Sequence, residues 1–314
     1  MSDRPNEISD EGHRWVTRSR TVVIDRPFVF GILNVTPDSF SDGGRFDTFD
    51  AAIVHAQHML EQGADAIDIG GESTRPQGAR VVSVDEETRR VIPVVRGLRA
   101  KFPAALISVD TTKSEVAAAA MDAGANIIND VSGFRLDPRM GEIVAAAGAG
   151  VVLMHSRGSV SEMGTYLHAN YRDTVGEVIS ELEQSLERAA AAGVRRECVV
   201  LDPGVGFAKR SEHSLRILNE LRRVVTLGLP IMVGVSRKRF VGELARVETT
   251  DQRAAGTIGA NVAALMNGAR LFRVHDVAPN RQALDVAWGV LRAGPGSRFP
   301  VPGSRLPVPD SRAE

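Results

Sequence analysis

The feature that most constrains the fold is a regular alternation along most of the chain. Short runs rich in β-branched residues end in polar residues, and each is followed by a longer stretch with helical apolar spacing. This alternation is typical of βα units that build a parallel sheet. The expected strands are residues 29–33, 66–69, 106–109, 126–128, 151–154, 199–201, 231–235 and 271–274. About eight units favour a closed (β/α)8 TIM barrel, although an open doubly wound sheet would show the same local alternation.

Two of the intervening helices can be placed from their boundaries. The first is expected to begin at Asp50, which can cap it, and to end at Gly63. The second ends at Gly193 and carries apolar residues at close to fourfold spacing, namely Val178, Leu182, Leu186 and Ala189. That spacing predicts an amphipathic helix on the outside of the barrel.

The ends of the chain lack the alternation. We expect a flexible N-terminal extension over 1–20, the barrel over 21–293 and a disordered, Pro/Gly-rich C-terminal tail over 294–314. Residues 21–24 and 28–30 flank an Asp-Arg-Pro turn, which predicts a short hairpin that plugs the bottom of the barrel.

Charge and cysteine content narrow the class of protein. The 38 basic and 39 acidic residues nearly cancel, which argues against a nucleic-acid partner and favours small molecules. The single cysteine, Cys198, excludes an internal disulfide and fits a reducing compartment. The first residues are polar, and the longest weakly apolar run, 143–154, is too short to span a membrane. We therefore expect a cytoplasmic protein with no membrane partner.

Polar residues follow nearly every expected strand. In a parallel barrel these positions share the carboxyl-end rim, where the active sites of this fold are built. An Asp or Asn after a strand often only caps the next helix, but that explanation does not suit Lys238, Arg273 or His275. The strand-end residues are Asn34, Asp68, Asp110, Asn129, Asp130, His155, Asp202, Ser236, Arg237, Lys238, Arg273, His275 and Asp276.

Three rim loops have distinctive chemistry. Residues 34–44 are polar around Phe40 and end in two glycines, which suits a mobile lid. Residues 70–76 bring hydroxyl groups and a guanidinium beyond the second strand. Residues 234–240 place Ser, Arg and Lys at a strand-to-helix junction, where an anionic ligand is expected; alone, the basic triplet could equally be a solvated surface run.

Other candidate residues are better explained by packing or solvation. His55 and His58 lie on an expected outer helix, while Trp15 and Trp288 lie near the ends and are expected to pack. The segment 204–206 lacks the third glycine and the downstream acid of a dinucleotide fingerprint, so no nicotinamide site is expected.

The rim motifs together resemble those of dihydropteroate synthases over roughly residues 28–290. The segments that carry the resemblance are GILNVTPDSFSDGG (31–44), DIGGESTRP (68–76), SVDTTK (108–113), INDVSG (128–133), LMH (153–155), LDPGVGFAK (201–209), GVSRKRF (234–240) and RVHDV (273–277). The resemblance implies a closed barrel. It also implies a transferase of folate biosynthesis that joins 6-hydroxymethyl-7,8-dihydropterin diphosphate to 4-aminobenzoate.

The resemblance further implies a role for each matching residue. Asp110 would lie near the reactive side of the pterin, and Asn129, Asp202 and Lys238 would read its edge. Ser236, Thr74 and Arg75 would hold the aminobenzoate carboxylate. Asn34 would bind Mg²⁺, and Arg273 and His275 would bind diphosphate. The ring would be enclosed by Phe40, Pro76 and Phe207, with Met154 and Gly206 completing the substrate site.

A mechanism without a covalent enzyme intermediate follows from this resemblance. Diphosphate would leave first, helped by Mg²⁺, Arg273 and His275, and the arylamine would then attack a cation stabilised by Asp110. Asp110, Lys238, Arg273 and His275 are accordingly the expected catalytic residues. Family resemblance also implies a homodimer and sulfonamide inhibitors that mimic 4-aminobenzoate.

The chain departs from the family pattern at two places at or near the rim, and the first, in the loop after the second strand, puts sulfonamide sensitivity in question. Gln77 is an extra residue after Pro76, and Ser156-Arg157-Gly158 replaces the more usual Met and Gln after the histidine at 155. Two other functions stay open: a barrel that transfers a methyl group from a pterin or folate, and a catalytically silent paralogue that only binds pterin.

Overall fold

The computed structural model describes residues 12–36, 45–72 and 82–293. Eight parallel strands form one sheet, and each lies where the alternation predicts a strand. Their bounds are β3 Phe28–Asn34, β4 Ala66–Gly70, β5 Leu106–Asp110, β6 Ile127–Asp130, β7 Gly150–Met154, β8 Val199–Asp202, β9 Met232–Val233 and β10 Leu271–Val274.

The sheet closes into a barrel. Neighbouring strands pair in chain order from β3 to β8, and β10 lies between β3 and β9. A parallel bridge between Leu201 and Ile231 joins β8 to the segment that leads into β9, and the Leu201 amide donates to Pro230 O at 3.0 Å. This excludes the open doubly wound sheet. β9 is shorter than expected because the chain turns away after it, with the Lys238 amide donating to Val235 O.

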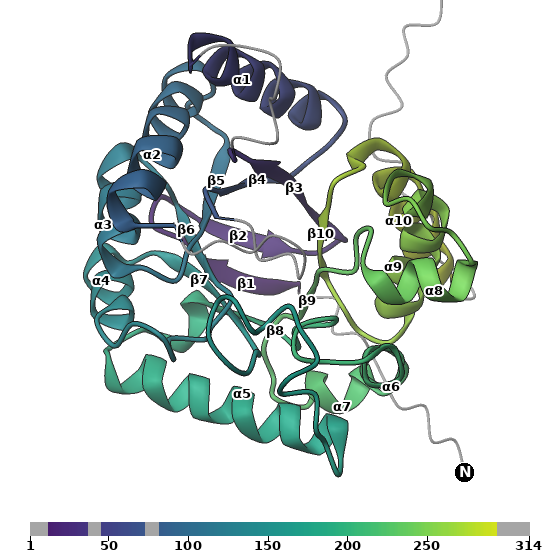
Figure 1. Cartoon of the computed structure of the whole chain (residues 1–314). Helices are drawn as coiled ribbons and strands as arrows, with labels where there is room; N and C mark the ends of the chain where they lie inside the picture. The colour runs from purple at the N-terminus through teal and green to yellow at the C-terminus, as the bar shows by residue number, and fades with distance from the viewer. Residues whose placement is uncertain (1–11, 37–44, 73–81, 294–314) are drawn as a thin grey trace, which may run out of the picture.

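Helices surround the strands (Figure 1). They are α1 Arg45–Glu61, α2 Val84–Lys101, α3 Ser114–Ala123, α4 Met140–Ala147, α5 Thr174–Ala191, α6 Ser211–Asn219, α7 Leu221–Val225, α8 Arg239–Ala245, α9 Ala254–Met266 and α10 Val277–Arg292. The apolar face of α5 is buried as predicted. The expected start of α1 is wrong, because this helix begins at Arg45 and Asp50 lies inside it.

A hairpin crosses the barrel (Figure 1), but its strands differ from those predicted. β1 His13–Val16 pairs with β2 Thr21–Ile24, whereas Phe28 begins the first barrel strand. Trp15 is fully buried against Phe28 and Phe30, and its indole Nε1 donates to Cys198 O at 2.8 Å. Residues 13–16 are therefore part of the folded unit, and the expected extension over 1–20 is too long.

The hairpin closes the end of the barrel opposite the polar rim. Its apolar residues share a cluster with the first residues of the barrel strands, among them Leu106, Ile127 and Leu271. A second, larger cluster fills the space between strands and helices. No helix in the described ranges is long and apolar enough to cross a membrane. The predicted tail over 294–314 lies outside the described residues.

Candidate active site

One cavity of about 680 Å³ opens at the carboxyl ends of the strands. Every predicted site residue that the structure describes lines it, although these residues come from seven different strand ends. They are Asn34, Asp110, Asn129, Met154, Asp202, Gly206, Phe207, Ser236, Lys238, Arg273 and His275. Phe40, Thr74, Arg75 and Pro76 lie outside the described residues, as does Gln77.

Arg273 links two acids from adjacent strands. Its Nε donates to Asp68 Oδ2 at 2.6 Å and its Nη2 donates to Asp110 Oδ2 at 2.8 Å. Asn129 Nδ2 also donates to Asp68 Oδ2, at 3.1 Å. These residues come from β10, β4, β5 and β6, which lie close together in the strand order although β10 is far from the others along the chain.

Burial sets the electrostatics of this cluster. Desolvation raises the pKa of Asp110 to about 7, although the charge of Arg273 opposes the rise. For Arg273, burial acts against the charged form, but Asp68 and Asp110 outweigh it and raise the pKa of the guanidinium. The cluster therefore holds a permanent cation beside a carboxyl group that can gain or lose a proton near neutral pH.

Asp202 is held at the end of β8 by its own turn. Its Oδ1 accepts a hydrogen bond from the Gly204 amide at 2.7 Å, and its side chain is buried at the cavity wall. Burial raises the pKa of Asp202, while the nearby Lys238 lowers it. A buried carboxylate whose fold already supplies one donor can accept paired N–H groups from a ligand.

Lys238 lies in the cavity wall near Asp202 and contacts the turn that follows β8. Its Nζ donates to Val205 O and lies 4.1 Å from the centroid of the Phe207 ring. Gly206 has a φ of +82°, and a Cβ there would lie 2.8 Å from Cδ of Lys238, so this position favours glycine. Burial lowers the pKa of Lys238 to about 7, against the opposing effect of Asp202.

Ser236 and His275 form a pair on the far side of Arg273. Ser236 Oγ lies 2.9 Å from His275 Nδ1 and accepts a hydrogen bond from the His275 amide at 3.1 Å. The adjacent Arg237 forms salt bridges with Asp276 and Asp251. The three basic residues 237–239 are therefore not equivalent, because the charge of Arg237 is balanced by two acids.

The residues present fit a magnesium ion that takes most of its ligands from water and from the phosphate groups of a substrate. Among the described residues no three His, Cys, Asp or Glu side chains gather as a metal site. Asn34 and Asp110 flank Gly70, where a Cβ would lie 3.6 Å from Asn34 Oδ1 and 3.9 Å from Asp110 Oδ2. A neutral amide oxygen at an open mouth suits a hard cation that keeps water and phosphate oxygens in its shell.

Comparison with known proteins identifies the family. A family model described as pterin binding enzyme matches residues 30–275. The dihydropteroate synthase of Mycobacterium leprae is 45% identical over 272 residues, covering 85% of this chain and 94% of that protein. That of Escherichia coli strain K12 is 41% identical over 276 residues, covering 88% of this chain and 96% of that protein. The chain belongs to the dihydropteroate synthase family.

Solved dihydropteroate synthases share the fold. The Xanthomonas albilineans enzyme with 4-aminobenzoic acid superposes with a TM-score of 0.84, at 45% identity, and the match covers 90% of this chain and 100% of that one. The same enzyme in complex with 7,8-dihydropteroate gives a TM-score of 0.80, at 43% identity, with the same coverage of both chains. The barrel expected from the resemblance is confirmed.

For a dihydropteroate synthase, the residues missed from the sequence are mainly partners of the expected ones. Asp68 was noted at a strand end, yet its contacts with Arg273 and Asn129 come from residues far away in the chain. Lys209 belongs to the motif 201–209 and borders the cavity, but its burial has no signal in the sequence. Tyr166 also lines the cavity, with the guanidinium of Arg239 4.7 Å from its ring centroid.

Proposed function

We propose that this protein is a dihydropteroate synthase, a transferase that condenses 6-hydroxymethyl-7,8-dihydropterin diphosphate with 4-aminobenzoate to give 7,8-dihydropteroate and diphosphate. The observation that carries the proposal is one cavity lined both by acids and amides suited to a heterocycle edge and by cations suited to diphosphate. Membership of the family and the ligands named for the solved relatives support it.

The pterin would bind deep in the cavity. Asp202 would accept paired N–H bonds from the aminopyrimidine edge, and Asn129 and Lys238 would donate to its carbonyl and ring nitrogens. Asn129 is held by Asp68, and Lys238 is held by Val205 O, so both donors are oriented before substrate binds. Met154 and Gly206 would complete the walls.

Diphosphate would bind at the mouth, against Arg273 and His275. Nε and Nη2 of Arg273 are taken by carboxylates, and among the described residues Nη1 contacts neither acid. This leaves one edge of the guanidinium for a phosphate oxygen. Asn34 would hold Mg²⁺, which when bound supplies Lewis-acid neutralisation of the leaving diphosphate.

The reaction breaks the bond between the methylene carbon and the diphosphate oxygen, and the electron pair leaves with that oxygen. Asp110, as a carboxylate near the reactive side of the pterin, would stabilise the cation that remains. The lone pair of the arylamine then forms the new C–N bond and its nitrogen loses a proton. No enzyme nucleophile is required.

The arylamine would lie beside Phe207, with its carboxylate near Ser236. Phe40 and Pro76 would enclose the ring, and Thr74 and Arg75 would assist at the carboxylate. Sulfonamides that mimic 4-aminobenzoate would compete for this site, and a change in loop closure at Gln77 would alter that competition by about 1 to 3 kcal/mol. We also propose a homodimer that works in the cytoplasm, in line with family resemblance.

One assay separates this function from the two alternatives. Protein, pterin diphosphate, Mg²⁺ and 4-aminobenzoate are mixed, and diphosphate release is measured with and without the arylamine. Release that depends on the arylamine supports the proposal. A methyl-transferring barrel has no use for Arg273 and His275 as diphosphate partners and would show no such release. A silent paralogue would bind pterin without any release. The absence of arylamine-dependent release would therefore refute the proposal.

A further inference from the structure

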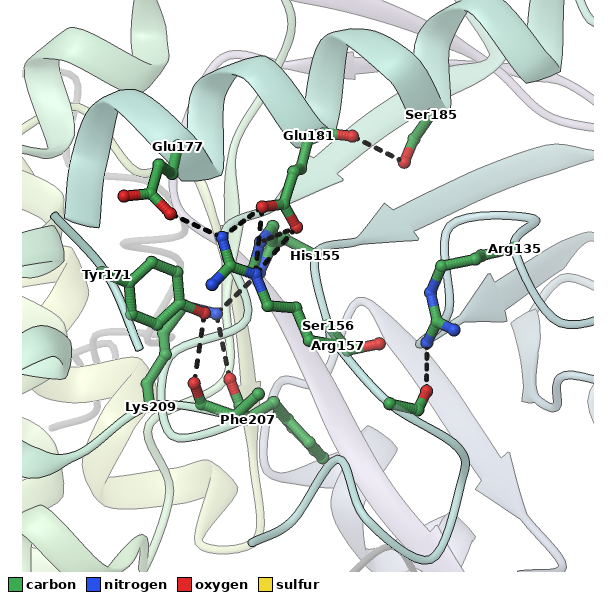
Figure 2. A network of polar contacts seen from close by, with 12 residues as sticks. Arg135, His155, Ser156, Arg157, Tyr171, Glu177, Glu181, Ser185, Phe207 and Lys209 are labelled. Atoms are coloured by element: carbon green, nitrogen blue, oxygen red, sulfur yellow. Dashed lines mark hydrogen bonds and ion pairs between the residues drawn. The ribbon is translucent and has the colours of Figure 1, made fainter. Parts of the chain in front are cut away.

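A chain of buried polar side chains runs from α5 to the turn that carries Phe207 (Figure 2). His155 Nε2 lies 3.0 Å from Glu181 Oε2, and His155 Nδ1 lies 2.7 Å from Lys209 Nζ. Lys209 Nζ also donates to Phe207 O at 3.0 Å. Lys209 is 2% exposed and borders the cavity, whereas His155 and Glu181 do not line it.

Three carbonyls of the turn after β8 accept hydrogen bonds from side chains. Val205 O accepts from Lys238, Phe207 O accepts from Lys209, and Ala208 O accepts from Tyr171 Oη at 3.1 Å. Ala208 has a φ of +48°, a conformation that L residues other than Gly, Asn and Asp rarely adopt. The amides of Phe207 and Ala208 also donate within the fold, to Gly204 O and Met163 O. The side chains that bind the three carbonyls add to these backbone bonds and help to fix the turn and the Phe207 ring.

The chemistry of each side chain in this network decides which atom donates and which accepts. The Glu181 carboxylate can only accept, so His155 Nε2 carries the proton and Nδ1 is the acceptor for Lys209. Lys209 then faces two acceptors, His155 Nδ1 and Phe207 O, which match the two N–H bonds of an uncharged amine. Burial lowers the pKa of Lys209 well below its usual range and lowers that of His155 to about 4.

Arg157 contacts the outer end of this row of side chains, at Glu181. Its guanidinium bonds Glu181 and Glu177 and lies 4.0 Å from the centroid of the Tyr171 ring (Figure 2). Partial burial acts against the charge of Glu181, but the bonds from His155 and Arg157 outweigh it and lower the pKa of Glu181 to about 2. Arg157 thus contacts Tyr171, one of the three side chains that bind the turn, and is linked to Lys209 through Glu181 and His155.

We propose that Lys209 is a positioning residue for the arylamine site, fixing Phe207 through its carbonyl and being fixed in turn by His155, Glu181 and Arg157. The proposal rests on the proposed function, in which the Phe207 ring borders 4-aminobenzoate. Asn129 and Asp202, which would read the pterin, lie on strands β6 and β8. Asp202 and Lys238 meet the turn at Gly204 and Val205, ahead of the Phe207 carbonyl that Lys209 binds. Loss of Lys209 should therefore weaken arylamine binding more than pterin binding.

The test compares Lys209→Met with Lys101→Met. Both remove an amine of similar length, but Lys101 lies on the outer helix α2 and donates to Gln57. We expect the KM for 4-aminobenzoate to rise at least tenfold in K209M, with the Kd of pterin diphosphate changed less than threefold and both constants unchanged in K101M. An unchanged KM would overturn the proposal. So would an equal loss of affinity for both substrates, since a general disturbance of the fold would produce that.

A second variant keeps the proposal falsifiable if K209M does not fold. Glu181→Gln removes the charge at the partly exposed end of the side-chain network formed by Glu181, His155 and Lys209. It should raise the KM for 4-aminobenzoate at least threefold with little change in pterin affinity. If only K101M and E181Q are folded, an unchanged KM in E181Q overturns the proposal. Wild type that shows no arylamine-dependent diphosphate release would instead refute the proposed function.

One readout does not depend on activity. The ¹⁵N spectrum of histidine-labelled protein should show His155 as the neutral Nε2–H tautomer at pH 6, with its signals assigned by their loss in His155→Gln. A doubly protonated His155 ring at that pH would remove the acceptor for Lys209 and overturn the proposal.

Discussion

Replacing Asp202 with Asn should abolish tight pterin binding without unfolding the protein. The Asn Oδ1 can still accept from the Gly204 amide, so the turn is retained. Its amide nitrogen, however, would face the N–H donors of the pterin edge. Losing a charge-assisted pair and opposing two donors should cost about 3 kcal/mol, or roughly a hundredfold in Kd. Because burial already raises the pKa of Asp202, removing its charge should cost little stability.

The assay is calorimetric titration with pterin diphosphate at fixed Mg²⁺, alongside thermal unfolding. Asp130→Asn is the matched control, since Asp130 is a fully buried strand-end acid that does not line the cavity. Its two oxygens accept from the Ser132 and Phe134 amides, at 2.7 and 3.0 Å, so this variant should lose about 1 to 3 kcal/mol of stability yet keep its Kd. A folded D202N protein that binds pterin within threefold of wild type would refute the assigned role.

Three further outcomes are expected. Arg273→Met leaves Asp68 and Asp110 without their cation, so its deficit in urea-unfolding free energy should reach about 3 kcal/mol at pH 9 and shrink toward pH 5, as Asp110 is protonated. A pH-independent deficit would contradict this. The pKa of Lys238 is about 7 in the folded protein and 10.5 ordinarily, so between these pH values the folded state binds fewer protons than the unfolded state. The free energy of unfolding of the wild type, relative to Lys238→Met, should therefore increase with pH across this window, by at most about 1.4 kcal/mol per pH unit. EDTA should stop diphosphate release while leaving the melting temperature unchanged, and added Mg²⁺ should restore release; activity that persists in EDTA would exclude the metal role of Asn34.

The strands could be predicted because each is a short run with a buried apolar pattern. Residues 271–274, for example, were placed with the bounds that β10 has in the structure. The convergence of strand-end residues on one cavity followed from parallel strands alone. Closure did not, because it depends on a single bridge between Leu201 and Ile231 that has no local signal.

Pairings over long separations account for what the sequence did not reveal. The turn at residues 25–27 predicts a hairpin over residues 21–30. In the structure residues 13–16 pair with residues 21–24 instead, and Trp15 packs against the barrel strands. The contact between Arg273 and Asp68 joins residues 205 positions apart. Lys209 was one of only four lysines, but its burial depends on His155, which belongs to another strand end.

The short strand β9 makes the barrel wall uneven. Between β8 and β9 the backbone is joined by one bridge, whereas β3 and β4 pair along five residues. Asp202 follows one side of this narrow junction and Lys238 follows the other. A pterin held by both side chains would span the least connected part of the barrel wall. Bound substrate would therefore link β8 to the segment after β9 and stiffen the barrel where the fewest backbone hydrogen bonds join its strands.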